Sequence, residues 1–197
     1  MKSSSIGRRP AAVVALAAIA FLATSCASPP LTLYTLEAAP PAAPASPSAG
    51  KLKVVEIRRV IVPDFLDNQD IMVRDGSTLA RSSRGRWASR LSLGATHFLT
   101  AQLAQSRPDL LITDQPQVEA PDYRVFVTIS RLDVKADGTA TLEADWLVVP
   151  RASGLPSQRR RGQFSATGSV ATDQDVVSLN RSVLEQLGQV IAASNPW

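Results

Sequence analysis

The strongest constraint on the fold is the alternation of apolar and polar residues in two neighbouring segments, residues 123–129 and 140–148. Successive side chains of a β-strand point to opposite faces of a sheet. The residues expected to face the core are Tyr123, Val125, Val127 and Ile129 in the first segment and Ala140, Leu142, Ala144, Trp146 and Val148 in the second. Asp137-Gly138 between them favours a hairpin. The pattern predicts two antiparallel strands with one buried face.

A third strand is expected over residues 160–170, where alternation again gathers small and apolar residues on one face. These residues are Phe164, Ala166, Gly168 and Val170. Residues 53–62 are rich in β-branched side chains and end at Pro63, which predicts a further strand followed by a break. Residues 71–74 and 78–81 are expected to form a short hairpin around Asp75-Gly76-Ser77.

Two helices are expected, over residues 87–105 and 173–193, because apolar residues recur there at helical spacing. The expected inward faces are Trp87, Leu91, Ala95, Phe98 and Leu99 in the first helix and Val176, Val183, Leu187, Val190 and Ile191 in the second. Residues 172–175 match a capping box at the start of the second helix. The sequence therefore predicts an α+β fold, an antiparallel β-sheet with two main helices packed on one face. The main core residues are expected to be Trp87, Leu91, Phe98, Trp146, Phe164 and Leu187.

The N-terminus has the order of a secretory signal: basic residues, an apolar run over residues 11–23, and small residues before Cys26. The run is about 13 residues, short of the roughly 20 that a membrane-spanning helix needs. Leu22-Ala23-Thr24-Ser25-Cys26 resembles a bacterial lipobox, so we expect cleavage before Cys26 and acylation of that residue. Ala27 stands where Asp usually marks inner-membrane retention, which favours the periplasmic face of the outer membrane. An uncleaved anchor and twin-arginine export are the alternatives.

The expected organisation is a lipoprotein signal peptide (residues 1–25), a lipidated segment with a tether (26–50) and a periplasmic α+β domain (51–197). Residues 31–36 are apolar enough for a strand or contact segment, with a disordered spacer as the alternative. Residues 37–50 are mostly Ala, Pro, Ser and Gly, a composition typical of a semi-extended tether.

The charge balance does not favour nucleic-acid binding. Removing the signal with Lys2, Arg8 and Arg9 leaves 18 basic residues against 17 acidic ones. The single cysteine also excludes an internal disulfide, so stability must come from an ordinary core. Two basic groups, residues 81–90 and Arg159-Arg160-Arg161, are expected to be solvated faces, with anionic lipid or an acidic partner surface as the functional alternative.

Catalytic and metal-binding signals are weak. His97 is the only histidine, and the sequence has neither a Gly-x-Ser-x-Gly elbow nor a phosphate-binding glycine loop. The acidic residues of segment 64–70 lack the glycine and distal glutamate of a calcium loop, and Asp173 and Asp175 fit helix capping. We therefore expect no enzymatic activity, no bound metal and no cofactor apart from covalent lipid on Cys26.

Several motifs resemble the PqiC/YmbA-like ABC-transport auxiliary lipoproteins. They are Cys26-Ala27-Ser28-Pro29 with Tyr34-Thr35-Leu36, residues 60–67 leading into residues 71–74, Arg86-Trp87-Ala88, residues 142–146 and Gly162-Gln163-Phe164. The resemblance implies a non-catalytic outer-membrane lipoprotein, serving a lipid-transport system whose periplasmic component carries mammalian-cell-entry (MCE) domains. It also implies self-association, because family members can assemble into rings. The alternatives are a lipid carrier with its own apolar cavity and an assembly factor for outer-membrane proteins.

Residues 63–74 are the stretch with the least obvious structural role. Phe65 and Leu66 are apolar residues just after a proline break, and Arg74 ends the next expected strand. An apolar anchor with a polar rim is typical of an interface. We therefore take Phe65, Leu66 and Arg74 as candidate residues for partner contact or self-association, with a packed loop as the alternative.

Overall fold

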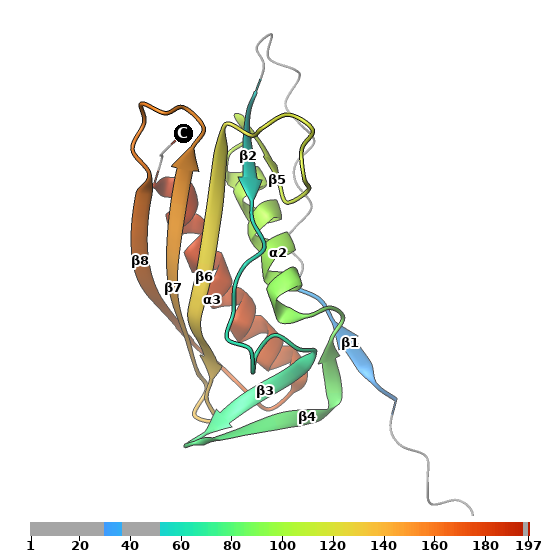
Figure 1. The fold of residues 1–197 in the computed structure, drawn as a ribbon. Coiled ribbons are helices and arrows are strands. Elements are labelled where there is room, and N and C mark those ends of the chain that lie inside the picture. The colour runs from blue at the N-terminus through green and yellow to red at the C-terminus, as the bar shows by residue number, and fades with distance from the viewer. Residues whose placement is uncertain (1–29, 37–51, 195–196) are drawn as a thin grey trace, which may run out of the picture. The chain divides into compact units, whose positions relative to one another are not determined.

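Eight strands and two helices make up the described part of the chain (Figure 1). This computed structural model describes residues 30–36, 52–194 and 197. The strands are β1 (Thr32–Tyr34), β2 (Lys53–Ile57), β3 (Asp70–Asp75), β4 (Thr78–Trp87), β5 (Leu110–Thr113), β6 (Tyr123–Val134), β7 (Thr139–Pro150) and β8 (Gln158–Thr167), and the helices are α2 (Leu91–Ser106) and α3 (Asp173–Ala193). The expected signal peptide, Cys26 and the tether over residues 37–50 lie outside the described residues.

A five-stranded sheet of order β5-β2-β6-β7-β8 forms the centre of the fold. Strands β6, β7 and β8 pair antiparallel, as the alternation predicts, and Gly138 takes a positive φ of 83° in the turn between β6 and β7. Strand β2 pairs in parallel with both β5 and β6. The fold is therefore α+β as expected, but its sheet is mixed and not purely antiparallel.

A second, three-stranded sheet of order β1-β4-β3 lies at one end of the first (Figure 1). Strand β1 runs parallel to β4, with Thr32 opposite Gly85 and Tyr34 opposite Trp87. The Ala88 amide donates to the Tyr34 carbonyl at 2.8 Å. The apolar segment near residue 31 thus provides a strand, and the compact unit spans Thr32–Trp197.

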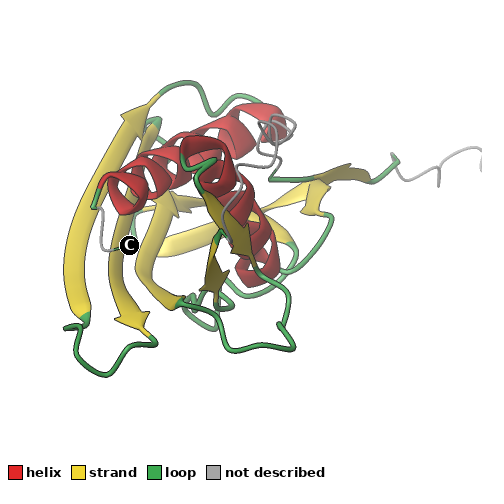
Figure 2. Ribbon diagram, turned by 90° about the horizontal axis from the view of Figure 1, so that it is seen from above, coloured by secondary structure: helices red, strands yellow, loops and turns green. Residues whose placement is uncertain are grey.

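Both helices lie on one side of the five-stranded sheet and cross each other there (Figure 2). Helix α3 begins with the predicted capping box, in which Thr172 Oγ1 accepts from the Asp175 amide at 3.2 Å and Asp175 Oδ2 accepts from the Thr172 amide at 3.0 Å. At the crossing, Gln102 of α2 donates to the Glu185 carbonyl of α3 at 2.9 Å. A Cβ atom added to Gly188 would overlap the Gln102 side chain, so this glycine permits the close approach.

The start of the first helix differs from the prediction. Trp87 ends strand β4, and helix α2 begins at Leu91. Trp87 is held in the strand by β1 on one side and by a 2.7 Å bond from its amide to the Gln69 carbonyl on the other. The helix starts where Asp67 accepts from the Ser92 amide at 3.2 Å. The helical spacing of Trp87 in the sequence is therefore coincidental.

Other boundaries also differ from the expectation. Strand β2 ends at Ile57, and Ile61 forms an isolated bridge with Thr128. Strand β4 is longer than the expected 78–81 segment, and β5 was not predicted. Val190, expected to face the sheet, is 43% exposed.

One continuous hydrophobic core fills the space between the helices and the sheets. All six residues expected at its centre are buried: Trp87, Leu91, Phe98, Trp146, Phe164 and Leu187. Trp87 reaches this core from a strand and not from a helix. No helix among the described residues is long and apolar enough to span a membrane.

Candidate interaction surface

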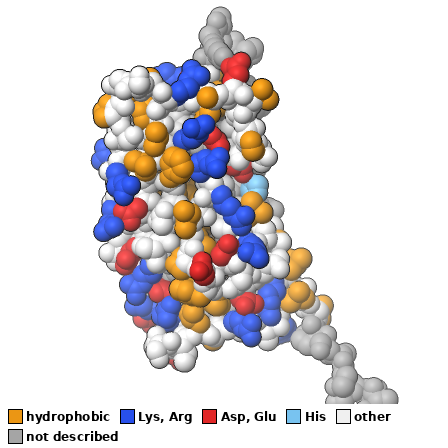
Figure 3. Space-filling view, viewed as in Figure 1, with side chains coloured by type: hydrophobic (Ala, Val, Ile, Leu, Met, Phe, Trp, Pro, Cys, Tyr) orange, Lys and Arg blue, Asp and Glu red, His pale blue; other side chains and the backbone are white. Residues whose placement is uncertain are grey.

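The outer sheet face is the side of the five-stranded sheet that faces away from both helices (Figures 1 and 3). Alternation along β6 buries Val125 and Val127, and it therefore turns Phe126 outward. Phe126 is 41% exposed and pairs with Leu147 of β7. Ile61, bridged to Thr128 of β6, is 61% exposed. We call Ile61, Phe126 and Leu147 the apolar stripe of the outer sheet face.

Arginines surround this stripe and are held by carboxylates of the sheet. Arg58 Nη1 lies 2.7 Å from Glu56 Oε1, and Arg124 Nε lies 3.1 Å from Glu56 Oε2. Burial by itself raises the pKa of Glu56, but hydrogen bonds from the two guanidinium groups outweigh it and hold that pKa below its ordinary value. Arg161 binds Asp145 through two bonds of 3.0 and 3.1 Å. The arginines are thus fixed in orientation while their outer surfaces remain exposed.

A second network lies at the end of the outer sheet face, around Asp133. Arg74 Nη2 is 2.9 Å from Asp133 Oδ1, and Arg131 Nε is 3.0 Å from Asp133 Oδ2. Arg131 also reaches Glu143 Oε1 at 3.2 Å. Burial raises the pKa of Asp133, but the hydrogen bonds from Arg74 and Arg131 outweigh burial and lower it. Asp133 is therefore a charged carboxylate shared by two arginines.

The structure separates the three candidate contact residues of segment 63–74. Phe65 is half exposed and lines an open hollow with Arg131 and Glu143, at the margin of the outer sheet face. Leu66 is buried in the core, so it is not available for a contact in the folded protein. Arg74 is committed to Asp133. Of the three, only Phe65 presents its side chain at the surface.

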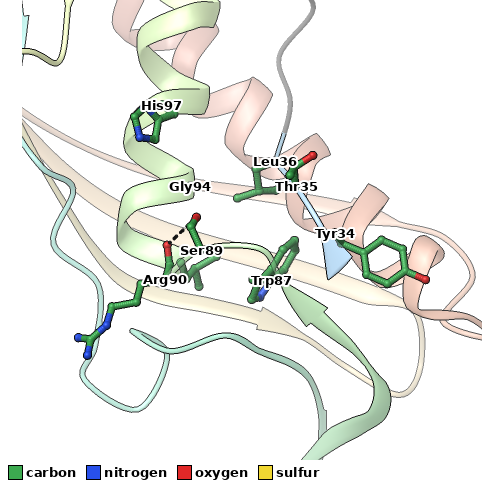
Figure 4. A pocket seen from close by; sticks show the side chains of 9 residues that line it. Tyr34, Thr35, Leu36, Trp87, Ser89, Arg90, Gly94 and His97 are labelled. Atoms are coloured by element: carbon green, nitrogen blue, oxygen red, sulfur yellow. Dashed lines mark hydrogen bonds between the residues drawn. The ribbon is translucent and has the colours of Figure 1, made fainter. Parts of the chain in front are cut away.

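A small apolar cavity lies between the N-terminal segment, the end of β4 and the first turns of α2 (Figure 4). Its volume is about 210 Å³, and its walls include Leu36, Trp87 and Leu91. The Arg90 side chain extends away from it (Figure 4). Pockets that bury a drug-sized ligand measure about 300–1,000 Å³. This cavity is therefore small for an acyl chain.

His97 lies at the margin of that cavity, with its Nδ1 atom 2.8 Å from Asp114 Oδ2. A carboxylate on Nδ1 can orient an imidazole for base catalysis. However, within the described ranges no hydroxyl or thiol group hydrogen-bonds to His97. The same residues contain no group of three or more His, Cys, Asp or Glu side chains that could hold a metal ion.

The outer sheet face was not among the sites predicted from the sequence. Phe126 carries a usable signal, because it is an aromatic residue at a position where the alternation of β6 calls for a polar side chain. Ile61 carries none, because its position depends on a bridge to β6, which is distant in sequence.

Comparison with known proteins identifies the family of this chain. The model of the ABC-type transport auxiliary lipoprotein component family matches residues 34–192, and the chain belongs to that family. This family serves transport, and it is a family of lipoproteins. No curated protein matches the chain.

Two solved structures share the fold. A crystal structure described as an uncharacterized protein has a TM-score of 0.68 at 17% identity, and the match covers 84% of this chain and 99% of that one. Protein XCC0632 from Xanthomonas campestris has a TM-score of 0.61 at 16% identity, with 82% and 92% covered. At such identities the likeness concerns the fold alone.

Proposed function

We propose that this chain is a non-catalytic outer-membrane lipoprotein that docks onto the periplasmic MCE-domain component of an ABC-type lipid-transport system. Acylated Cys26 provides the membrane anchor, and the outer sheet face provides the docking surface. Family membership supports the role in transport. The observation that carries the proposal is the apolar stripe on a sheet face that the described elements leave uncovered.

The composition of the outer sheet face supports docking. Interfaces are enriched in aromatic residues and arginine, and their apolar centre is surrounded by a polar rim. Here Phe126 and Ile61 form the centre, while Arg124 and Arg161 belong to the rim. Their guanidinium groups are already oriented by Glu56 and Asp145, which lowers the entropy lost on binding. An acidic surface on the partner would complement these arginines.

Docking is favoured over the two alternative functions. A lipid carrier needs an apolar cavity that encloses an acyl chain, and the cavity beside Trp87 measures only about 210 Å³. The larger hollows, such as the one lined by Phe65 and Arg131, are open and bordered by charged residues. For an assembly factor, no feature of the described residues gives specific support.

The test is capture of an MCE-domain protein from the same organism by the detergent-extracted mature lipoprotein. Phe126→Asp and Ile61→Asp place a charge in the apolar stripe and should lower capture at least tenfold, the effect of roughly 1.4 kcal/mol. Leu155→Asp is the matched control, because Leu155 is exposed to a similar degree but lies in the β7–β8 loop. Circular dichroism checks folding.

Unchanged capture by the folded Phe126→Asp and Ile61→Asp variants would refute docking through the outer sheet face. Equal loss with Leu155→Asp would show that the effect is not specific to that face. Light scattering of the same samples measures self-association, which the family resemblance leads us to expect. A Phe65→Asp variant that lowers the oligomer mass without affecting capture would assign Phe65 to contacts between copies.

A further inference from the structure

Chain length limits how far the folded unit can lie from its anchor. Strand β1 begins at Thr32, six residues after Cys26. An extended chain spans at most about 3.6 Å per residue, so Thr32 lies within about 22 Å of the anchored cysteine. The Pro-rich residues 37–50 follow β1 in sequence, so they cannot add to this distance while β1 remains paired with β4.

Strand β1 occupies one edge of the three-stranded sheet. Tyr34 pairs with Trp87 and packs against the core, and alternation therefore turns the preceding residue, Leu33, to the other side. Leu33 is 59% exposed and pairs with Arg86. An exposed leucine beside an arginine thus lies within a few residues of the anchor.

Positive charge gathers around this edge. Asp70 faces both Arg81 and Arg86 at 3.3 Å, and Asp67 lies 3.9 Å from Arg90 and 3.8 Å from Arg59. Each carboxylate is thus shared by two guanidinium groups. Figure 3 shows several Lys or Arg side chains at the lower right of the molecule.

Arg84 increases this excess of positive charge. Its side chain is exposed, and it has no ion-pair partner among residues 30–36 and 52–194. Asp173, which accepts from Ser82 Oγ at 2.9 Å, adds one further carboxylate from the inner side of β4. Among the residues named here, five arginines stand against three aspartates.

We propose that the β1–β4 edge, formed by Leu33, Arg81, Arg84 and Arg86, faces the membrane and binds anionic phospholipid headgroups. The inference rests on the lipid anchor of the proposed function but not on docking through the outer sheet face. Basic residues close to an anionic surface are attracted to it, and salt weakens that attraction. Leu33 adds an apolar contact at the headgroup level. The domain is thereby held in one orientation while the outer sheet face stays free for its partner.

The test uses the acylated protein in vesicles. Cys26 is the only cysteine, and acylation blocks its thiol, so one introduced cysteine can be labelled alone. Leu33→Cys and, as a matched control, Leu155→Cys each receive an environment-sensitive fluorophore. Both positions are exposed, and Leu155 lies in the β7–β8 loop at the far end of the five-stranded sheet (Figure 1). The vesicles contain phosphatidylethanolamine and phosphatidylglycerol with a nitroxide-headgroup lipid as quencher, and phosphatidylcholine vesicles serve for comparison.

The expected result is at least roughly twofold stronger quenching at position 33 than at position 155 in the anionic vesicles, with the difference reduced by salt. The charge reversals Arg81→Glu and Arg84→Glu should reduce quenching at position 33 in anionic vesicles but not in phosphatidylcholine. Circular dichroism verifies that these surface variants fold.

Three outcomes would overturn the inference. Equal quenching at positions 33 and 155 would mean that the domain has no fixed orientation. Charge reversals without effect would mean that the arginines do not bind headgroups. A mature protein without acyl groups on Cys26 would remove the anchor, and the inference would fail with it. Loss of docking is measured separately by capture of the MCE-domain protein, so failure of either idea can be recognised.

Discussion

Arg74 Nη2 lies 2.9 Å from Asp133 Oδ1, and this ion pair joins the β3–β4 hairpin to strand β6. The connection is reinforced by a 2.9 Å bond from the Ala136 amide to the Arg74 carbonyl. Polar contacts thus join β3 of the smaller sheet to the β6–β7 hairpin of the larger one. Arg74 therefore has a structural role, the ion pair with Asp133, that requires no binding partner.

Arg74→Ala should destabilise the fold by about 2 kcal/mol, because it removes a hydrogen-bonded charge from the buried Asp133 carboxylate. Urea unfolding measures the loss, and Arg159→Ala, at an exposed arginine of β8, should change stability by less than about 0.5 kcal/mol. If the Arg74→Ala variant had the same stability in urea as the wild type but no longer captured the MCE-domain protein, Arg74 would be a contact residue.

Low pH should reduce the stability of the folded protein, and part of this reduction should depend on Asp133. Arg74 and Arg131 lower the pKa of this carboxylate in the folded state. A lowered folded pKa stabilises the fold at pH values above the unfolded pKa of about 3.9, and this contribution is lost as pH falls through the folded pKa.

Asp133→Asn should therefore lower the urea midpoint at neutral pH, and the difference from wild type should shrink below about pH 4. Glu56 should also stabilise the fold at neutral pH and lose this contribution in acid, since its pKa is lowered as well. A difference that stayed constant from pH 7 to pH 3 would show that the charge of Asp133 does not contribute.

The helix crossing predicts a compensating pair of substitutions. Gly188→Ala should cost roughly 1–3 kcal/mol, because the new methyl group meets the buried Gln102 side chain. Adding Gln102→Ala should recover part of that loss, since it removes the clashing atoms. Thermal unfolding of the four proteins gives the coupling energy, and additive effects would mean that the helices move apart instead.

Cys26→Ser should release the protein from the membrane fraction. Stable anchoring takes more than one acyl chain, because a single chain binds only marginally. Mass spectrometry of the wild type should find an N-terminal acylated Cys26. A mature protein that retained residues 1–25 would refute the lipoprotein assignment, whereas the folded unit that starts at Thr32 would be unaffected.

Patterns among residues close in sequence predicted the hairpin and the helix cap correctly. The β6–β7 hairpin, its Asp-Gly turn and the capping box of α3 all follow from residues close in sequence. The parallel pairings of β1 and β2 were not predictable, because each joins segments far apart in sequence. Strand β5 has only four residues, too few for a clear period.

The candidate site was predictable only in part. Phe65 was identified because an apolar residue after a proline break is unusual in a loop, and it does lie at the surface. Leu66 has the same sequence signal but is buried. Sequence spacing could not separate the two, because the direction of each side chain depends on contacts with distant residues.

The pairing of β1 with β4 also has a mechanical consequence. Tension on the anchor passes first through three pairs of residues, from Thr32 opposite Gly85 to Tyr34 opposite Trp87. If pulling separated these strands, the force would next reach the core contacts of Tyr34 and Leu36. The short β1–β4 pairing is therefore the first part of the folded unit to bear a pull between the membrane anchor and a docked partner, ahead of the five-stranded sheet.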